Sequence, residues 1–96
     1  MTKEEISGHI CDVLTAIQKD SGQPAPVLSD KTIPLAELIE FDSLACVDAE
    51  VRLSERLGVD IEKLPFKSVK DGREQSIREI VDYVSATYGA KLGEKS

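Results

Sequence analysis

The chain has 96 residues, of which 12 are basic and 18 acidic, and its formal net charge is −6. This charge argues against nucleic-acid binding, which needs a basic surface, and the lack of a long apolar run argues against a membrane span. The length predicts a single domain over residues 1–96, with a core at about residues 2–88 and a flexible tail at 89–96.

The first predicted helix begins at a capping box, because Thr2 and Glu5 have the required spacing. Its apolar residues recur at helical intervals and form one stripe. The members of this stripe are Ile6, Ile10, Val13, Leu14 and Ile17. Gly22 is a suitable left-handed cap and predicts the end of the helix.

A long loop follows over about residues 22–41, because Pro24, Pro26 and Pro34 punctuate this stretch. A loop of this length in a compact domain is usually functional or held down by its own apolar residues. The residues that we expect to hold it across the bundle are Val27, Leu28, Ile33, Leu35, Leu38 and Ile39. Within the loop, residues 35–40 are compatible with a short helical turn.

A second helix is predicted from about Ser43 to Leu57, with Gly58 at its end. At about 100° per residue the helix has two distinct faces. The face expected to meet the core carries Cys46, Ala49, Leu53 and Leu57. A second stripe, roughly opposite, carries Leu44, Asp48, Val51 and Glu55. This stripe fits either ordinary surface residues or a partner-docking strip with an apolar centre and an acidic rim.

The remaining chain predicts one short and one long helix. Residues 65–69 are compatible with a short third helix or a single turn, and residues 70–74 form a polar loop. Ser76 and Glu79 make a second capping box. The last helix follows with the apolar residues Ile77, Ile80, Val81, Val84 and Tyr88. This order predicts an all-α fold, a small three-to-four-helix bundle with a long loop between the first and second helices.

The two cysteines and the single histidine predict neither a disulfide framework nor a metal site. Cys11 and Cys46 are far apart and each falls in a helical pattern, so we expect buried or half-buried free thiols in a reducing compartment. The polar N-terminal segment shows no secretory signal, and we therefore expect a cytoplasmic protein.

Ser43 is the candidate functional residue, because we expect its hydroxyl to be exposed at the start of the second helix. Asp42 can cap the first turn, and the free backbone N–H groups and the helix dipole favour a phosphate there. A catalytic serine would need a base within hydrogen-bond distance, and nothing in the pattern brings His9 to Ser43. We therefore expect no enzyme; an acceptor serine, by contrast, would need only exposure.

The run FDSLACVD at residues 41–48, followed by RLSERLGVDI at residues 52–61, resembles the second helix of acyl carrier proteins. Over the rest of residues 6–88 the similarity is a match of helix spacing. The resemblance implies a helical bundle and a covalent 4'-phosphopantetheine arm on Ser43, which would carry acyl groups as thioesters. The partner-binding residues that it implies are Asp42, Leu44, Asp48, Val51 and Glu55.

Under this resemblance the protein would deliver intermediates of fatty-acid, lipid or polyketide-type biosynthesis. Its partners would be a phosphopantetheinyl transferase and acyl-transferring and synthase enzymes with basic docking patches, and a monomer is the default state. The chain departs from the family at Glu40, where a glycine is usual, at Arg52 and Arg56, and in the long polar loop 69–75. These differences favour a specialised carrier. Two alternatives stay open: an aminoacyl or peptidyl carrier, and an unmodified helical adaptor.

Overall fold

Four helices follow one another in the computed structural model, which describes residues 2–39, 41–68 and 71–91. They are α1 (Lys3–Asp20), α2 (Pro34–Glu37), α3 (Ser43–Leu57) and α4 (Ile77–Tyr88). Within the described residues there is no strand beyond a single isolated bridge. The predicted all-α bundle with a long loop between its first and second long helices is confirmed.

Capping boxes set the starts of α1 and α4. The Thr2 hydroxyl accepts from the Glu5 N–H at 3.2 Å, and the Glu5 carboxylate accepts from the Thr2 N–H at 2.8 Å. Ser76 and Glu79 make the same reciprocal pair at the start of α4. These hydrogen bonds favour the charged carboxylates and lower the pKa of both Glu5 and Glu79. Both helices therefore begin where the local sequence rule predicts.

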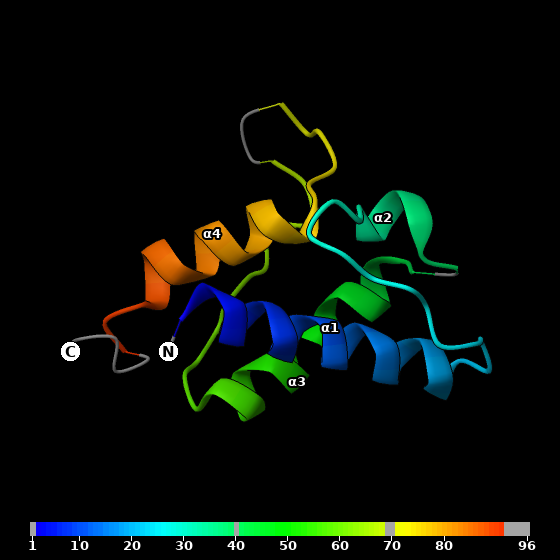
Figure 1. Ribbon diagram of the computed structural model, residues 1–96, viewed down its shortest axis with the longest axis horizontal. Helices are drawn as coiled ribbons and strands as arrows, with labels where there is room; N and C mark the ends of the chain where they lie inside the picture. Colours follow the sequence, from blue (N-terminus) through cyan, green and yellow to red (C-terminus); the bar gives the residue numbers. More distant parts are fainter. Residues whose placement is uncertain (1, 40, 69–70, 92–96) are drawn as a thin grey trace.

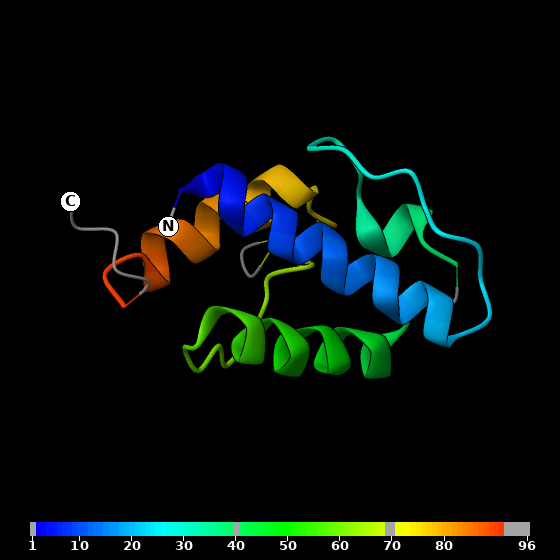
Figure 2. The same cartoon turned by 60° about the horizontal axis from the view of Figure 1, so that its bottom comes forward.

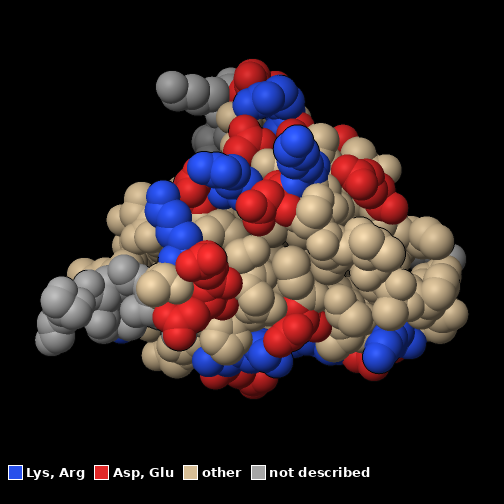
Figure 3. All heavy atoms as spheres, in the orientation of Figure 1, with Lys and Arg blue, Asp and Glu red and all other residues tan. Residues whose placement is uncertain are grey.

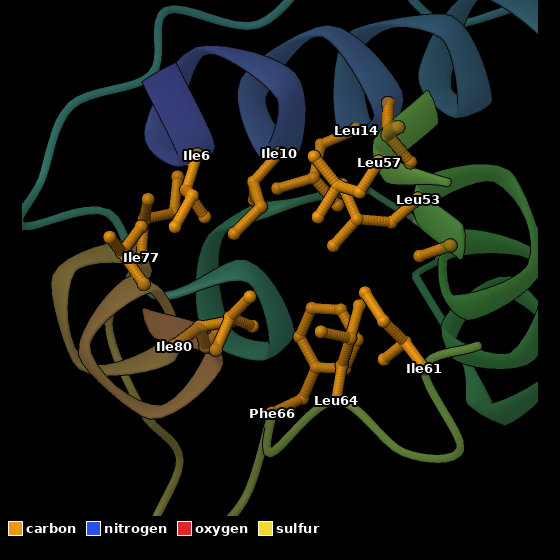
Figure 4. Close-up of a cluster of buried hydrophobic side chains, with 14 of the residues drawn as sticks. Ile6, Ile10, Leu14, Leu53, Leu57, Ile61, Leu64, Phe66, Ile77 and Ile80 are labelled. Carbon is orange, nitrogen blue, oxygen red and sulfur yellow. The ribbon is translucent and has the colours of Figure 1, made fainter. Parts of the chain in front are cut away.

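α1 is the central helix, and it packs against both α3 and α4. Both partners run in the opposite general direction to α1, and they lie on different sides of it (Figures 1 and 2). At one end of the core, Ile6 of α1 faces Ile77 of α4 (Figure 4). At the other end, Leu14 lies near Leu53 of α3, and residues 61–66 close the remaining side (Figure 4).

The predicted apolar stripes of α1 and α4 are buried throughout. On α3 the predicted core residues Ala49, Leu53 and Leu57 are buried, whereas Cys46 is only half-buried and packs at the margin of the core. Leu53 is completely enclosed, with 0 % of its surface exposed. Full burial of such a side chain contributes about 1.5–3 kcal/mol, so these stripes determine which face of each helix turns inward.

The long loop is held by part of the predicted apolar set, namely Leu28, Ile33, Leu35 and Leu38, which are buried or half-buried. The prediction was wrong for Val27 and Ile39, which are 96 % and 52 % exposed. Figure 3 shows few charged side chains on the side where the loop and α2 lie. The helical turn expected at residues 35–40 is α2, which begins at Pro34 and ends at Glu37; Glu40 lies outside the described residues.

Backbone carbonyl groups of the long loop accept hydrogen bonds from the first N–H groups of α4. The N–H of Ile77 donates to the carbonyl oxygen of Thr32 at 2.8 Å, and the N–H of Arg78 donates to that of Asp30 at 3.0 Å. The first N–H groups of a helix have no acceptor within the helix, so these carbonyls satisfy them. The loop and α4 are therefore one packed unit, although they are far apart in sequence.

Residues 65–69 were expected to form a short third helix or a single turn; residues 65–68 are not helical, so the helix is wrong there, and Val69 lies outside the described residues. Lys67 instead forms an antiparallel bridge with Glu74. The N–H of Ser68 donates to the carbonyl oxygen of Arg73 at 2.7 Å. This segment projects from the bundle above α2 and α4 in Figure 1. No described helix combines the length and the apolar character that crossing a bilayer requires.

Candidate functional site

Ser43 is the first residue of α3, and its side chain is exposed. The carboxylate of Asp42 accepts from the N–H of Ala45 at 3.0 Å, which is the predicted cap. The N–H groups of Ser43 and Leu44 belong to the first turn of α3, which offers them no acceptor within the helix, and they point toward its open end. The Ser43 hydroxyl therefore lies at the positive end of the helix dipole, where a phosphate ester is favoured.

The C-terminal end of α3 is capped, as its N-terminal end is. Gly58 adopts a left-handed φ of 72°, and its N–H donates to the carbonyl oxygen of Ser54 at 2.9 Å. The hydroxyl of Ser54 then accepts from the N–H of Ile61 at 2.9 Å, which ties the chain after the helix back to it. The predicted bounds of this helix are thus confirmed, and they place Ser43 at its exposed tip.

A groove of about 720 Å³ opens beside Ser43. Leu35 of α2, Cys46 of α3 and Phe66 form its apolar part, and Lys63 and Lys67 contribute cations. Its residues come from α2, from Asp42 and α3, from residues 63–68 and from residues 72–74. Reading the sequence did not find this groove, because it forms only where residues 63–68 fold back against α2 and α3. A cavity of this size is within the range that holds small ligands.

Glu50 of α3 has a structural role in the groove. The carboxylate of Glu50 accepts from the N–H of Leu64 at 2.9 Å and so fixes the opposite wall of the groove.

Burial raises the pKa of the Cys46 thiol, and the negative charges of Glu50 and Asp42 raise it further. A thiol with a raised pKa stays protonated at neutral pH, so the local environment does not activate Cys46 as a nucleophile. Cys11 and Cys46 are both free and half-buried, as predicted.

His9 is far from Ser43. Its Nδ1 accepts a hydrogen bond from the Nε of Arg56 at 3.2 Å. Arg56 lies at the other end of α3, about 20 Å along the helix from Ser43 at 1.5 Å per residue. Among residues 2–39, 41–68 and 71–91, no group of three or more His, Cys, Asp or Glu side chains could hold a metal ion. His9 is therefore not placed to act as a base for Ser43.

Three exposed aliphatic side chains form a ridge along α3, which we call the docking ridge. Leu44, Val47 and Val51 are 78 %, 55 % and 54 % exposed. They follow one another at i, i+3 and i+7, so they share one helix face. Val47 was missed in the sequence, although its spacing from Leu44 could have revealed it. Glu55 is also exposed and extends the same line by one further turn.

Asp48 is placed differently from Glu55. Its Oδ1 accepts from the Nε of Arg52 at 2.9 Å, and the Nη2 of Arg52 donates to the Oδ2 of Asp20 on α1 at 2.6 Å. Hydrogen bonds to Asp48 and then to Asp20 raise the pKa of Arg52. Asp48 is therefore half-buried and paired, and Glu55 is the more accessible acid beside the docking ridge.

Comparison with family models gives no match, and comparisons with curated proteins and with solved structures also give none. The likeness to carrier proteins consequently rests on the pattern of residues 41–61. The functional interpretation rests on the geometry around Ser43.

Proposed function

We propose that this protein is an acyl carrier protein, which holds acyl intermediates as thioesters on a 4'-phosphopantetheine arm attached to Ser43. The observation that carries this proposal is the position of Ser43, exposed at the first residue of α3. The docking ridge continues directly from it along the helix, and the groove opens beside it. An approaching transferase would meet the ridge, and the attached arm would have the groove within reach.

Transfer of the arm to Ser43 would require few groups of this chain. The Oγ of Ser43 would form a bond to the phosphorus that carries the pantetheine group of coenzyme A. The pyrophosphate bond would break, adenosine bisphosphate would leave, and the hydroxyl proton would pass to a base of the transferase. The contribution of this chain is an accessible hydroxyl and a helix N-terminus that stabilises the resulting phosphodiester.

Delivery requires weak and reversible contacts with several enzymes. A short apolar ridge with an exposed acid beside it suits a small interface, and charge attraction speeds the encounter with basic partners. The net charge of −6 acts in the same direction. We therefore propose the phosphopantetheinyl transferase and the acyl-transferring and synthase enzymes of fatty-acid, lipid or polyketide-type pathways as partners.

The test is co-expression with a broad-specificity phosphopantetheinyl transferase, followed by mass spectrometry of the intact chain. We expect the mass to rise by one arm per chain. Ser43→Ala should abolish the gain. Ser21→Ala, which removes an exposed hydroxyl at the end of α1, should leave it unchanged. An unmodified wild-type chain under conditions that load a known carrier would overturn the proposal.

A second candidate function is an unmodified helical adaptor, and the exposure of Val47 favours it, because Val47 fills the gap between Leu44 and Val51 and makes the docking ridge continuous. If the protein is an adaptor, its Ser43→Ala variant should bind the partner as well as the wild type does. Neither form should gain an arm. An aminoacyl or peptidyl carrier would share Ser43 and the arm and differ in cargo. The exposed Glu55 beside the docking ridge favours an acyl carrier over an aminoacyl or peptidyl carrier.

A further inference from the structure

The segment that forms the wall of the groove opposite α3 is fixed to the helix region at two points. The N–H of Leu64 donates to the carboxylate of Glu50 at 2.9 Å, in the middle of α3. The ring of Phe66 packs against the ring of Phe41 with centroids 5.2 Å apart, and Phe41 directly precedes the N-cap of α3. Between these two points the segment therefore runs from the middle of α3 to its N-terminal end.

Lys67, the next residue, brings a positive charge to the Ser43 end of the groove, which both residues line. The pKa of the Cys46 thiol reflects this charge: burial raises that pKa, and the positive charge of Lys67 acts in the opposite direction. Cys46 lies one helical turn after Ser43, so Lys67 is close to the first turn of α3. Lys63 also lines the groove, but it comes before the contact with the middle of α3.

Within the described part of the chain, Lys67 forms no ion pair with a carboxylate. Two carboxylates that border the groove accept from backbone N–H groups, since Asp42 caps α3 and Glu50 holds the opposite wall. Glu74 faces Lys67 across the isolated bridge, but it is exposed and does not pair with it. The ammonium group of Lys67 is therefore available to a phosphate, which is a strong partner for such a cation.

Ser43 lies between the groove and the docking ridge. At 100° per residue, the groove residues Cys46 and Glu50 lie about 60° and about 20° to one side of Ser43 around α3. The residues of the docking ridge lie about 40–100° to the other side. An arm attached to Ser43 could lean toward either face, and a cation on one side would favour that side.

We propose that Lys67 is a positioning residue of the carrier site, because its ammonium group pairs with the phosphodiester that joins the arm to Ser43 and turns the base of the arm toward the groove. This inference rests on the proposed carrier function. An exposed ion pair is weak, so the paired state is favoured about two- to fivefold over the free one. A bias of this size orients the arm and still lets a partner enzyme draw it away.

The experiment records the phosphorus NMR spectrum of the loaded protein, in which the phosphodiester of the arm is the only phosphorus. The wild type is compared with Lys67→Gln, Lys67→Arg and Lys63→Gln, each loaded to completion as checked by intact mass. Lys63→Gln is the matched control, because it removes the same charge from the other end of the same groove. A urea unfolding curve for each variant shows that it is folded.

Lys67→Gln should free the base of the arm. Its phosphorus resonance should be narrower than that of the wild type and shifted toward the position found in the urea-unfolded loaded protein. Lys67→Arg keeps the positive charge and should resemble the wild type, as should Lys63→Gln. High salt should move the wild type toward Lys67→Gln, because it screens the pair.

The inference is overturned if Lys67→Gln gives the same resonance as the wild type, or if Lys63→Gln changes it as much. Both results leave the carrier proposal standing, because the arm is attached in each case. A wild-type chain that accepts no arm overturns the carrier proposal and this inference together.

Discussion

The side chain of Gln18 holds the backbone of Ile39 through two hydrogen bonds. Its Nε2 donates to the Ile39 carbonyl oxygen at 2.8 Å, and its Oε1 accepts from the Ile39 N–H at 3.3 Å. Gln18 is on α1 and is only 2 % exposed. Because Ile39 lies just before the residues that lead into Ser43, this amide anchors the end of the long loop at the site.

Replacing Gln18 with Leu should destabilise the protein by about 1–3 kcal/mol, because two backbone groups of Ile39 would lose their partners. The measurement is the midpoint of urea unfolding with an unchanged m-value. Gln23→Ala provides the comparison, since Gln23 is only half-buried and should shift stability by less than about 0.5 kcal/mol. Equal effects of the two substitutions would contradict the anchoring role.

Asp42 is expected to have separable effects on stability and on modification. Asp42→Ala removes the cap of α3 and should cost about 1 kcal/mol in urea unfolding. Asp42→Asn keeps a side-chain oxygen that can accept from the Ala45 N–H, so its stability should stay near that of the wild type. If Asp42→Asn still slows transfer of the arm, the charge of Asp42 serves recognition. Equal unfolding midpoints for the Ala and Asn variants would contradict the capping role.

The capping boxes predict loss of stability in acid. The Glu79 carboxylate accepts from the Ser76 N–H at 2.8 Å, and this bond lowers the pKa of Glu79 from its ordinary value of 4.5. The unfolded chain therefore binds more protons than the folded one near this pH. The contribution is complete above the ordinary pKa of Glu79 and disappears as the pH falls through the lower folded pKa.

We expect the urea midpoint to fall between about pH 5 and pH 3, the window of such carboxylates. Glu79→Gln keeps a capping-box side chain but removes the titration, so its midpoint should fall less steeply. Parallel pH profiles for the wild type and Glu79→Gln would show that the carboxylate of Glu79 does not contribute.

Glu55 should affect docking without affecting stability, because it is exposed and lies in line with the docking ridge. Glu55→Lys should lower kcat/KM for transfer of the arm at low salt and lose most of this effect near 1 M salt, where the screening length is about 3 Å. Glu62→Lys makes the same change of charge at an exposed residue outside α3. An unchanged rate at low salt would count against docking by charge.

The ends of the long helices could be predicted because neighbouring residues determine them. Thr2 and Ser76 satisfy N–H groups three residues later, and Gly58 adopts the left-handed conformation that ends α3. These interactions span a few residues, so their pattern is visible in the sequence. The exposure of Ser43 follows from the same rule, because its position depends on the start of α3.

The features that the sequence did not reveal depend on partners far along the chain. Phe66 packs edge-on against Phe41 with ring centroids 5.2 Å apart, and residues 65–68 around it are not helical, although a short helix or a single turn was expected there. Gln18 is polar and was not assigned to the core, since its partner is a backbone group 21 residues later. Local periodicity carries no information about either contact.

The hydrogen bonds from Ile77 and Arg78 to the carbonyls of Thr32 and Asp30 have a consequence for how the chain matures on the ribosome. The carbonyl groups of Asp30 and Thr32 can accept these hydrogen bonds only when the start of α4 has left the exit tunnel. Until then, α1 and α3 can pair, but the stretch that precedes Ser43 lacks this attachment. If Ser43 is the acceptor proposed above, a transferase that acts on a nascent chain would meet Ser43 before the long loop is attached to α4.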